Sequence, residues 1–152
     1  MYRRDDEIER SVLVMASKGR VQGLDRASGE VRWEVVVTDQ VDRYTNAFAV
    51  ELLVTATRVY AASWMSNDLV CVAYPSGQEL GRVTLPLSTR GRPVMVVDGD
   101  QLFVARNGQV AALTLDGQPQ WTQTFGHEGQ KMVPTALGFP GNVRQADDRY
   151  ER

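Results

Sequence analysis

Apolar and polar residues alternate along most of this chain in short runs, which is the pattern of β-strands with one buried face. Gly-containing dipeptides such as Asn107-Gly108 and Asp116-Gly117 separate several runs and favour tight hairpins, because their residues tolerate positive φ. The pattern predicts strands at Ser11–Ser17, Arg20–Asp25, Val31–Val37, Ala47–Thr55, Arg58–Ser63, Leu69–Tyr74, Leu80–Leu85, Pro93–Val97, Gln101–Arg106, Gln109–Thr114, Pro119–Phe125 and Lys131–Phe139.

One of these segments, Ala47–Thr55, is compatible with helix or strand by periodicity alone. A repeat along the chain decides for a strand. Val21–Trp33 returns in altered form at Val70–Gly81 and again at Val110–Trp121. Each copy reads as a strand, a turn ending in Gly and a second strand, and repeats of about 40–45 residues are typical of units that bury their faces against neighbours.

The first copy resembles the blade repeat of the PQQ-like (quinoprotein-type) β-propellers, A-x-D-x-x-T-G-x-x-x-W, with Gly23, Asp25, Ser28, Gly29 and Trp33 at that spacing. The second copy keeps Ser76 and Gly77, but has Cys71 in place of Ala and Gly81 in place of Trp. The third keeps Ala112, Gly117 and Trp121 and is one residue shorter in the turn. The resemblance covers roughly residues 12–125. It implies four-stranded blades with Trp33 and Trp121 packed between them, and it does not imply catalysis, because many members look like non-enzymatic scaffolds.

We therefore expect an all-β, incomplete propeller of about three four-stranded blades. The expected organisation is a polar segment at 1–10, a repeat domain at 11–140 and a flexible tail at 141–152, with units near 11–37, 47–86 and 92–125. The first unit has three strands, and the strand at 131–139 is expected to complete it within one chain or between two. Since closed propellers typically have about four to eight blades, we expect a homodimer with six. Half of an eight-bladed ring, or a fragment of a larger protein, are the alternatives.

Composition narrows the classes of partner. The net charge of −2 gives no basic field for nucleic acid, and no apolar run approaches the ~20 residues that span a membrane. The start of the chain, MYRRDDEIER, lacks an apolar segment after its Arg pair, which predicts no signal peptide and a cytoplasmic, bacterial-type protein. The single cysteine, Cys71, lies in an alternating strand and is expected to be a buried filler.

Candidate chemistry is sparse, and we expect no catalytic residue, cofactor or metal ligand. His127 is the only histidine and lies in a Gly-flanked loop, while the Asp98-Gly99-Asp100 turn and the Asp147-Asp148 pair lack the further ligands of a calcium loop. Exposed Trp, Met and Arg are enriched at interfaces, so the candidate contacts for a protein or peptide partner are Trp64, Met65, Arg43, Tyr44 and Phe48. The function predicted is a non-enzymatic interaction scaffold, and the alternative is a protein that binds a small molecule or quinone cofactor in the ring channel.

Overall fold

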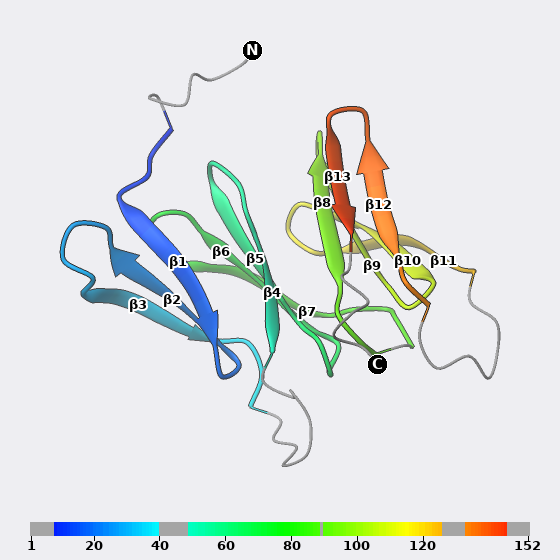
Figure 1. Cartoon of the computed structure of the whole chain (residues 1–152), viewed down its shortest axis with the longest axis horizontal. Coiled ribbons are helices and arrows are strands. Elements are labelled where there is room, and N and C mark those ends of the chain that lie inside the picture. The colour runs from blue at the N-terminus through cyan, green and yellow to red at the C-terminus, as the bar shows by residue number, and fades with distance from the viewer. Residues whose placement is uncertain (1–7, 40–48, 89, 126–132, 146–152) are drawn as a thin grey trace.

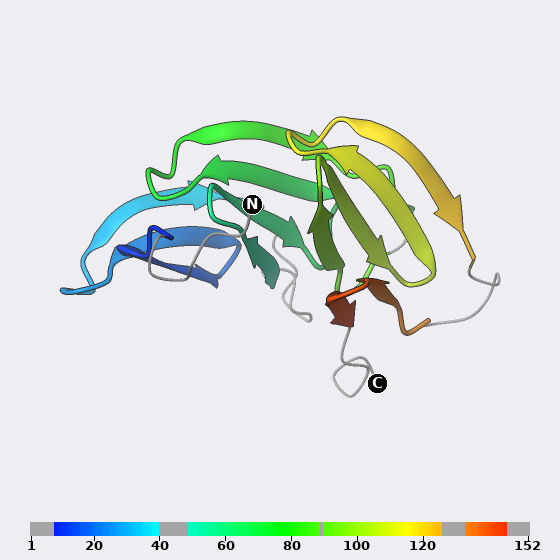
Figure 2. The ribbon, with the colours of Figure 1, turned by 90° about the horizontal axis from the view of Figure 1, so that it is seen from above.

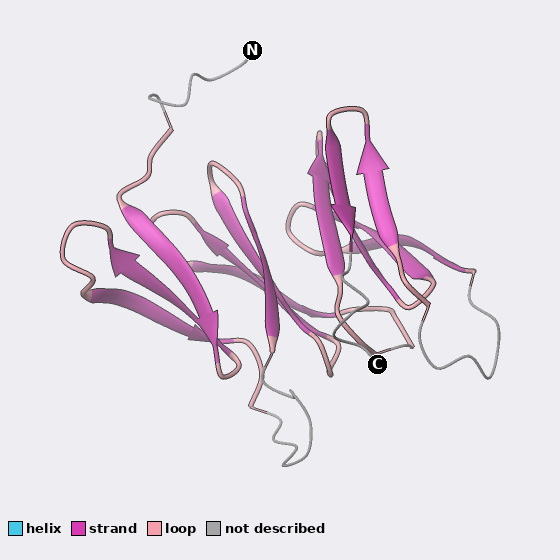
Figure 3. Ribbon diagram, in the orientation of Figure 1, coloured by secondary structure: helices cyan, strands magenta, loops and turns pink. Residues whose placement is uncertain are grey.

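The structure is a computed structural model that describes residues 8–39, 49–88, 90–125 and 133–145. Every regular element in these ranges is a strand (Figure 3). The strands are β1 (Val12–Ser17), β2 (Arg20–Asp25), β3 (Val31–Val36), β4 (Val50–Val54), β5 (Arg58–Ser63), β6 (Asp68–Ala73), β7 (Glu79–Thr84), β8 (Val94–Asp98), β9 (Gln101–Arg106), β10 (Gln109–Thr114), β11 (Pro119–Thr124), β12 (Ala136–Phe139) and β13 (Asn142–Gln145). The all-β prediction is confirmed, including a strand rather than a helix at β4.

The strands form three larger antiparallel sheets and a terminal hairpin (Figure 1). The first sheet has three strands in the order β1-β2-β3, and the second and third have four each, β4-β5-β6-β7 and β8-β9-β10-β11. Figure 2 shows these sheets following one another along an arc, with the β12-β13 hairpin close to β8. The chain is thus an incomplete propeller of about three blades, as its repeat predicts.

The three copies of the repeat have the same strand register. Gly23 lies opposite Trp33, Cys71 opposite Gly81 and Ala112 opposite Trp121. In each sheet the register shifts immediately after the first residue of that pair, between Gly23 and Leu24 in the first copy and at the equivalent places in the other two. An irregularity conserved in position within one chain marks these three hairpins as copies of one structural unit.

The turn of each repeat needs a glycine at its end. In the first copy Gly29 has φ 76° and donates its N–H to Asp25 O at 2.8 Å, and Gly77 has φ 78° in the second. In the third, Gly117 donates to Thr114 O at 2.9 Å, three residues back instead of four, with φ 94°. Only glycine adopts a positive φ at little energetic cost, so the shortened turn still has a glycine, Gly117, at this position.

The core lies in the layers between successive sheets. Between the first and second sheets the buried residues are small and branched, and include Val21, Val59 and Val72. Between the second and third sheets the residues are larger and include Tyr60, Leu102 and Leu113. The second sheet therefore buries one face on the first sheet and the other face on the third. No sheet forms a core alone, which is the expectation for a repeat fold.

The C-terminal segment differs from the prediction in two ways. A single strand was expected at Lys131–Phe139, but the strand is Ala136–Phe139, with 131–132 outside the described residues. A further strand, Asn142–Gln145, falls inside the expected flexible tail, because Gly141 with φ 81° reverses the chain. The hairpin packs on β8 of the third sheet rather than completing the first sheet of its own chain, since Leu137 contacts the buried pair Val94 and Ala105.

Candidate functional site

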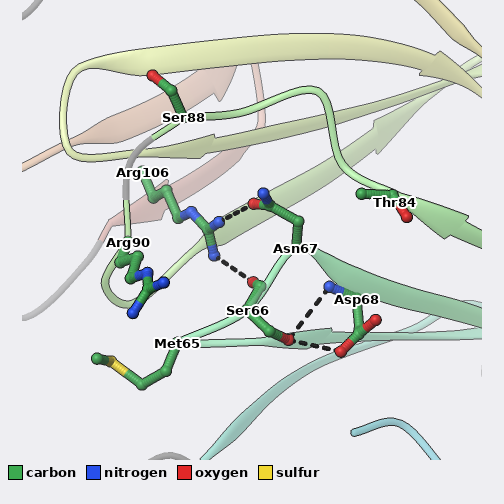
Figure 4. Close-up of a pocket in the computed structure, with 8 residues that line it drawn as sticks. All are labelled: Met65, Ser66, Asn67, Asp68, Thr84, Ser88, Arg90 and Arg106. Carbon is green, nitrogen blue, oxygen red and sulfur yellow. Dashed lines mark hydrogen bonds between the residues drawn. The ribbon is translucent and has the colours of Figure 1, made fainter. Parts of the chain in front are cut away.

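A polar pocket of about 390 Å³ lies where the second and third sheets meet at one end of their strands (Figure 4). We call it the rim pocket. The β5–β6 loop, the end of β7 with the connection that follows it, and the end of β9 contribute its walls. Its lining residues are Met65, Ser66, Asn67, Asp68, Thr84, Ser88, Arg90 and Arg106.

Arg106 forms the buried floor of this pocket. Its side chain is 1% exposed, and one guanidinium nitrogen donates to Ser63 O at 3.1 Å and to Ser66 O at 2.9 Å. The other donates to Asn67 Oδ1. Burial, and then the nearby charge of Arg90, lower the pKa of Arg106 to about 10, so the group stays cationic near neutral pH. A buried cation with three oxygen acceptors ties the β5–β6 loop to the third sheet.

The loop itself is held in one conformation by hydroxyl groups. Ser63 Oγ accepts from the backbone N–H groups of Met65 at 3.3 Å and Ser66 at 3.2 Å. The Ser66 hydroxyl donates to the Asp68 carboxylate at 2.7 Å (Figure 4). Met65 is half-buried in the pocket wall, and Arg90, which also lines the pocket, is exposed. The pocket therefore presents an apolar thioether and a cation on a preorganised frame.

Trp64, the first of the predicted partner contacts, lies partly inside the fold. The Arg92 guanidinium carbon lies 5.7 Å from the centre of its ring, and Arg92 also binds the Glu51 carboxylate through two nitrogens at 3.1 and 3.2 Å. The indole N–H is buried and has no hydrogen-bond partner among the residues that the structure describes. These contacts give Trp64 a part in holding the loop against β4, and its role in partner binding stays a prediction.

The other predicted contacts are only partly placed. Met65 lines the rim pocket, whereas Arg43, Tyr44 and Phe48 lie outside the described residues. Sequence reasoning did not single out Arg106, which it placed only as the last residue of a predicted strand. The available signal was the run Leu-Phe-Val-Ala-Arg, in which a charged residue follows directly on buried positions.

A second surface lies on the outer face of the third sheet. It contains the rings of Phe103, Trp121 and Phe139, and we call it the aromatic surface. The centre of the Phe103 ring is 6.2 Å from that of Trp121 and 5.3 Å from that of Phe139. A pocket of about 450 Å³ opens between them, with Val110 and Leu137 in its walls and Asp98 at its edge. Trp121 is 46% exposed, so among the residues that the structure describes it is not packed between blades as expected.

Groups suited to redox or metal chemistry do not gather in either place. Burial raises the pKa of the Cys71 thiol to about 11, which keeps it protonated and weakly nucleophilic. Across the described residues, no cluster of three or more His, Cys, Asp or Glu side chains could hold a metal ion.

The repeated register, the Gly turns and the arc of sheets define a propeller-repeat protein of the PQQ-like class. Comparison with known families places it more narrowly. Residues 65–151 match the family described as outer membrane protein assembly factor BamB, and the chain belongs to that family. The comparison with curated proteins found no match.

Two solved structures share the fold. BamB from Moraxella catarrhalis is 22% identical with a TM-score of 0.53, over 75% of this chain and 33% of that one. A protein of unknown function from Bacteroides caccae is 14% identical with a TM-score of 0.50, over 76% of this chain and 41% of that one. The chain thus spans about a third to two fifths of the length of these proteins.

The family overturns the prediction of a cytoplasmic protein. That prediction came from the charged start of the chain, whereas the matching family carries the description of an outer membrane protein assembly factor. In the part of the chain that the structure describes, no helix is long and apolar enough to cross a membrane.

Proposed function

We propose that this protein is a non-enzymatic interaction scaffold that holds an acidic, extended segment of a protein partner at the rim pocket. Membership of a family named for an assembly factor supports a role in protein interaction at a coarse level. The observation that carries the finer proposal is the pairing of exposed Arg90 with half-buried Met65 over the buried cation Arg106.

The charges of the rim pocket favour an anionic ligand. Arg90 and Arg106 are close enough for the charge of Arg90 to contribute to the lowered pKa of Arg106. A ligand carboxylate beside Arg90 would relieve this repulsion between two cations. Asp68 also lines the pocket, where its carboxylate accepts from the Ser66 hydroxyl at 2.7 Å, and the two arginines outweigh its single negative charge.

Shape and rigidity favour a peptide over a flat partner surface. The pocket is about 390 Å³, enough for one or two side chains, and the loop around it is fixed by Ser63, Ser66 and Arg106. A preorganised site loses little conformational entropy on binding. Met65 supplies a polarizable contact that accepts aliphatic or aromatic side chains of differing shape.

A fluorescence anisotropy titration tests this function. The probe is a fluorescein-labelled peptide that alternates Asp or Glu with Leu and Phe, and the comparison probe replaces each acid with Lys. We expect saturable binding of the acidic probe alone, weakened at least about tenfold by Arg90→Ala and less by Met65→Ala. The matched control is Arg20→Ala, since Arg20 is an exposed arginine on the first sheet, 51% exposed and paired with Glu34.

Two results would overturn the proposal. One is equal binding of the acidic and basic probes. The other is an equal loss of affinity in Arg90→Ala and Arg20→Ala, because the attraction would then be a property of the whole surface. Binding should also weaken with added salt, since screening acts on exposed charges.

A further inference from the structure

The contact between the first and second sheets shows how one repeat recognises the next. The Trp33 indole N–H donates to Pro75 O at 2.8 Å, in the turn of the second copy. Its ring lies over Gly77, where an added Cβ would come within 2.3 Å of ring atoms. Trp33 is therefore docked on the glycine end of the following turn, and the missing side chain of Gly77 makes room for it.

The contact between the second and third sheets uses the same two places. Gly81 replaces Trp at the docking position, and a Cβ there would lie 2.8 Å from Asp116 O in the turn of the third copy. Here the turn approaches the strand directly, and Val83 packs on Gly117. At both internal contacts, the docking position of one sheet meets the turn of the next.

At each end of the arc, one half of this contact has no counterpart in the described ranges of the chain. Trp121 is the docking residue of the third sheet and is 46% exposed on the aromatic surface. The corresponding turn of the first sheet ends at Gly29, and a Cβ added there would meet nothing within 4 Å. The first sheet also exposes apolar side chains on the face turned away from the second sheet, with Leu13 61% and Met15 43% exposed.

From these complementary ends we propose that two copies of this chain close one ring, in which Trp121 of each copy docks on the Asp25–Gly29 turn of the other. The occupant of the aromatic surface is thus a second copy of this chain. Two chains bring six larger sheets together, which is within the range of about four to eight for closed propellers. The same contact occurs twice across a two-fold axis and leaves neither end of the arc unmatched.

The number of strands at the two ends supports this occupant. The first sheet has three strands where the others have four. The β12-β13 hairpin, in turn, covers the β8 and β9 side of the third sheet and leaves β11 exposed along its whole length. The three-stranded first sheet of a second copy, packed on the part of the third sheet that the hairpin leaves free, would lie beside that hairpin.

Charges agree with the same pairing. Exposed Asp98 borders the aromatic surface, and exposed Arg26 lies in the receiving turn. Opposite charges at the edges of two apolar faces favour association in one orientation.

Sedimentation equilibrium or light scattering in the micromolar range tests the proposal. We expect twice the 16.9 kDa of one chain. Trp121→Ala should raise the dissociation constant at least about tenfold, as a central aromatic contact does. Ser28→Arg places a long side chain in the receiving Asp25–Gly29 turn and should raise the dissociation constant by a similar factor. The control Leu80→Ala removes a side chain that is 42% exposed on β7, next to the docking position, and should leave the mass unchanged.

Every outcome of these mass measurements either supports or overturns the proposed ring of two chains. A single-chain mass over the whole concentration range overturns the proposal, as does a dimer that neither Trp121→Ala nor Ser28→Arg weakens. Since the two variants alter opposite ends of the arc, misfolding of one leaves the other as the test. The peptide titration at the rim pocket is independent, because a monomeric variant keeps that pocket whole.

Discussion

Replacement of Trp33 by Ala measures how strongly the first two sheets hold together. A buried Trp removes about 150–250 Å² from water, which at about 25 cal/mol per Å² corresponds to roughly 4–6 kcal/mol. Trp33 is only partly buried, and Ala retains some contact, so about 3 kcal/mol of this is lost. The hydrogen bond from the indole to Pro75 O adds about 1 kcal/mol. We therefore expect Trp33→Ala to lower the free energy of unfolding by about 4 kcal/mol.

A second variant separates the two contributions. Trp33→Phe keeps an aromatic ring between Gly23 and Gly77 but removes the indole N–H, and should cost about 1–2 kcal/mol. Urea unfolding followed by far-ultraviolet circular dichroism gives both values, with exposed Leu80→Ala as the control within about 0.5 kcal/mol of the unmodified protein. If Trp33→Ala changes stability no more than Leu80→Ala does, Trp33 does not join the sheets and the docking argument fails.

Three further variants test other contacts. Gly81→Ala should destabilise the protein by about 1–3 kcal/mol in urea unfolding, because its methyl group would press on Asp116 O. Arg106→Met should cost about 3 kcal/mol in the same assay and more than Arg106→Lys, because it leaves the carbonyl groups of the β5–β6 loop without their donor. Burial raises the pKa of Cys71 to about 11 from the model-compound value of 9.0; its contribution to stability is therefore full below pH 9 and falls between pH 9 and 11, a loss that Cys71→Ala should remove from the pH profile.

Each of these has a contrary result. An unchanged stability in Gly81→Ala would show that the third turn can move away from β7. Equal stability of Arg106→Met and Arg106→Lys would show that the carbonyl groups find water instead. A pH profile of Cys71→Ala that parallels the unmodified protein would place the loss on another group, and Tyr60, whose pKa burial also raises, is the first to examine.

The repeat was readable from sequence because its signals are local. A turn that needs Gly29 at positive φ, and a Trp four residues further on, can be recognised without knowing what they touch. The residues that they contact in the neighbouring sheet cannot be recognised in the same way. The place of Gly81 looked like a degenerate position, yet the close approach of Asp116 O explains why this copy has no side chain there.

The rim pocket depends on contacts that sequence does not display. Arg106 bonds to Ser63 O and Ser66 O from about 40 positions away, so its burial follows from how two sheets stack. The β12-β13 hairpin was missed for a different reason. Its second strand, Asn-Val-Arg-Gln, lacks the β-branched alternation by which strands are recognised. The Gly, Asn and charged residues in this part of the chain suggested a flexible tail.

The two internal contacts between sheets also limit how this protein can be rearranged. The first contact contains the wide indole ring of Trp33, and the second has only the backbone of Gly81. Each unit is therefore complementary in shape to its own neighbour. Exchanging the order of the units would set Trp33 against the carbonyl of Asp116, where only a glycine fits. The units are therefore not interchangeable modules, and variation in this chain must change docking residue and facing turn together.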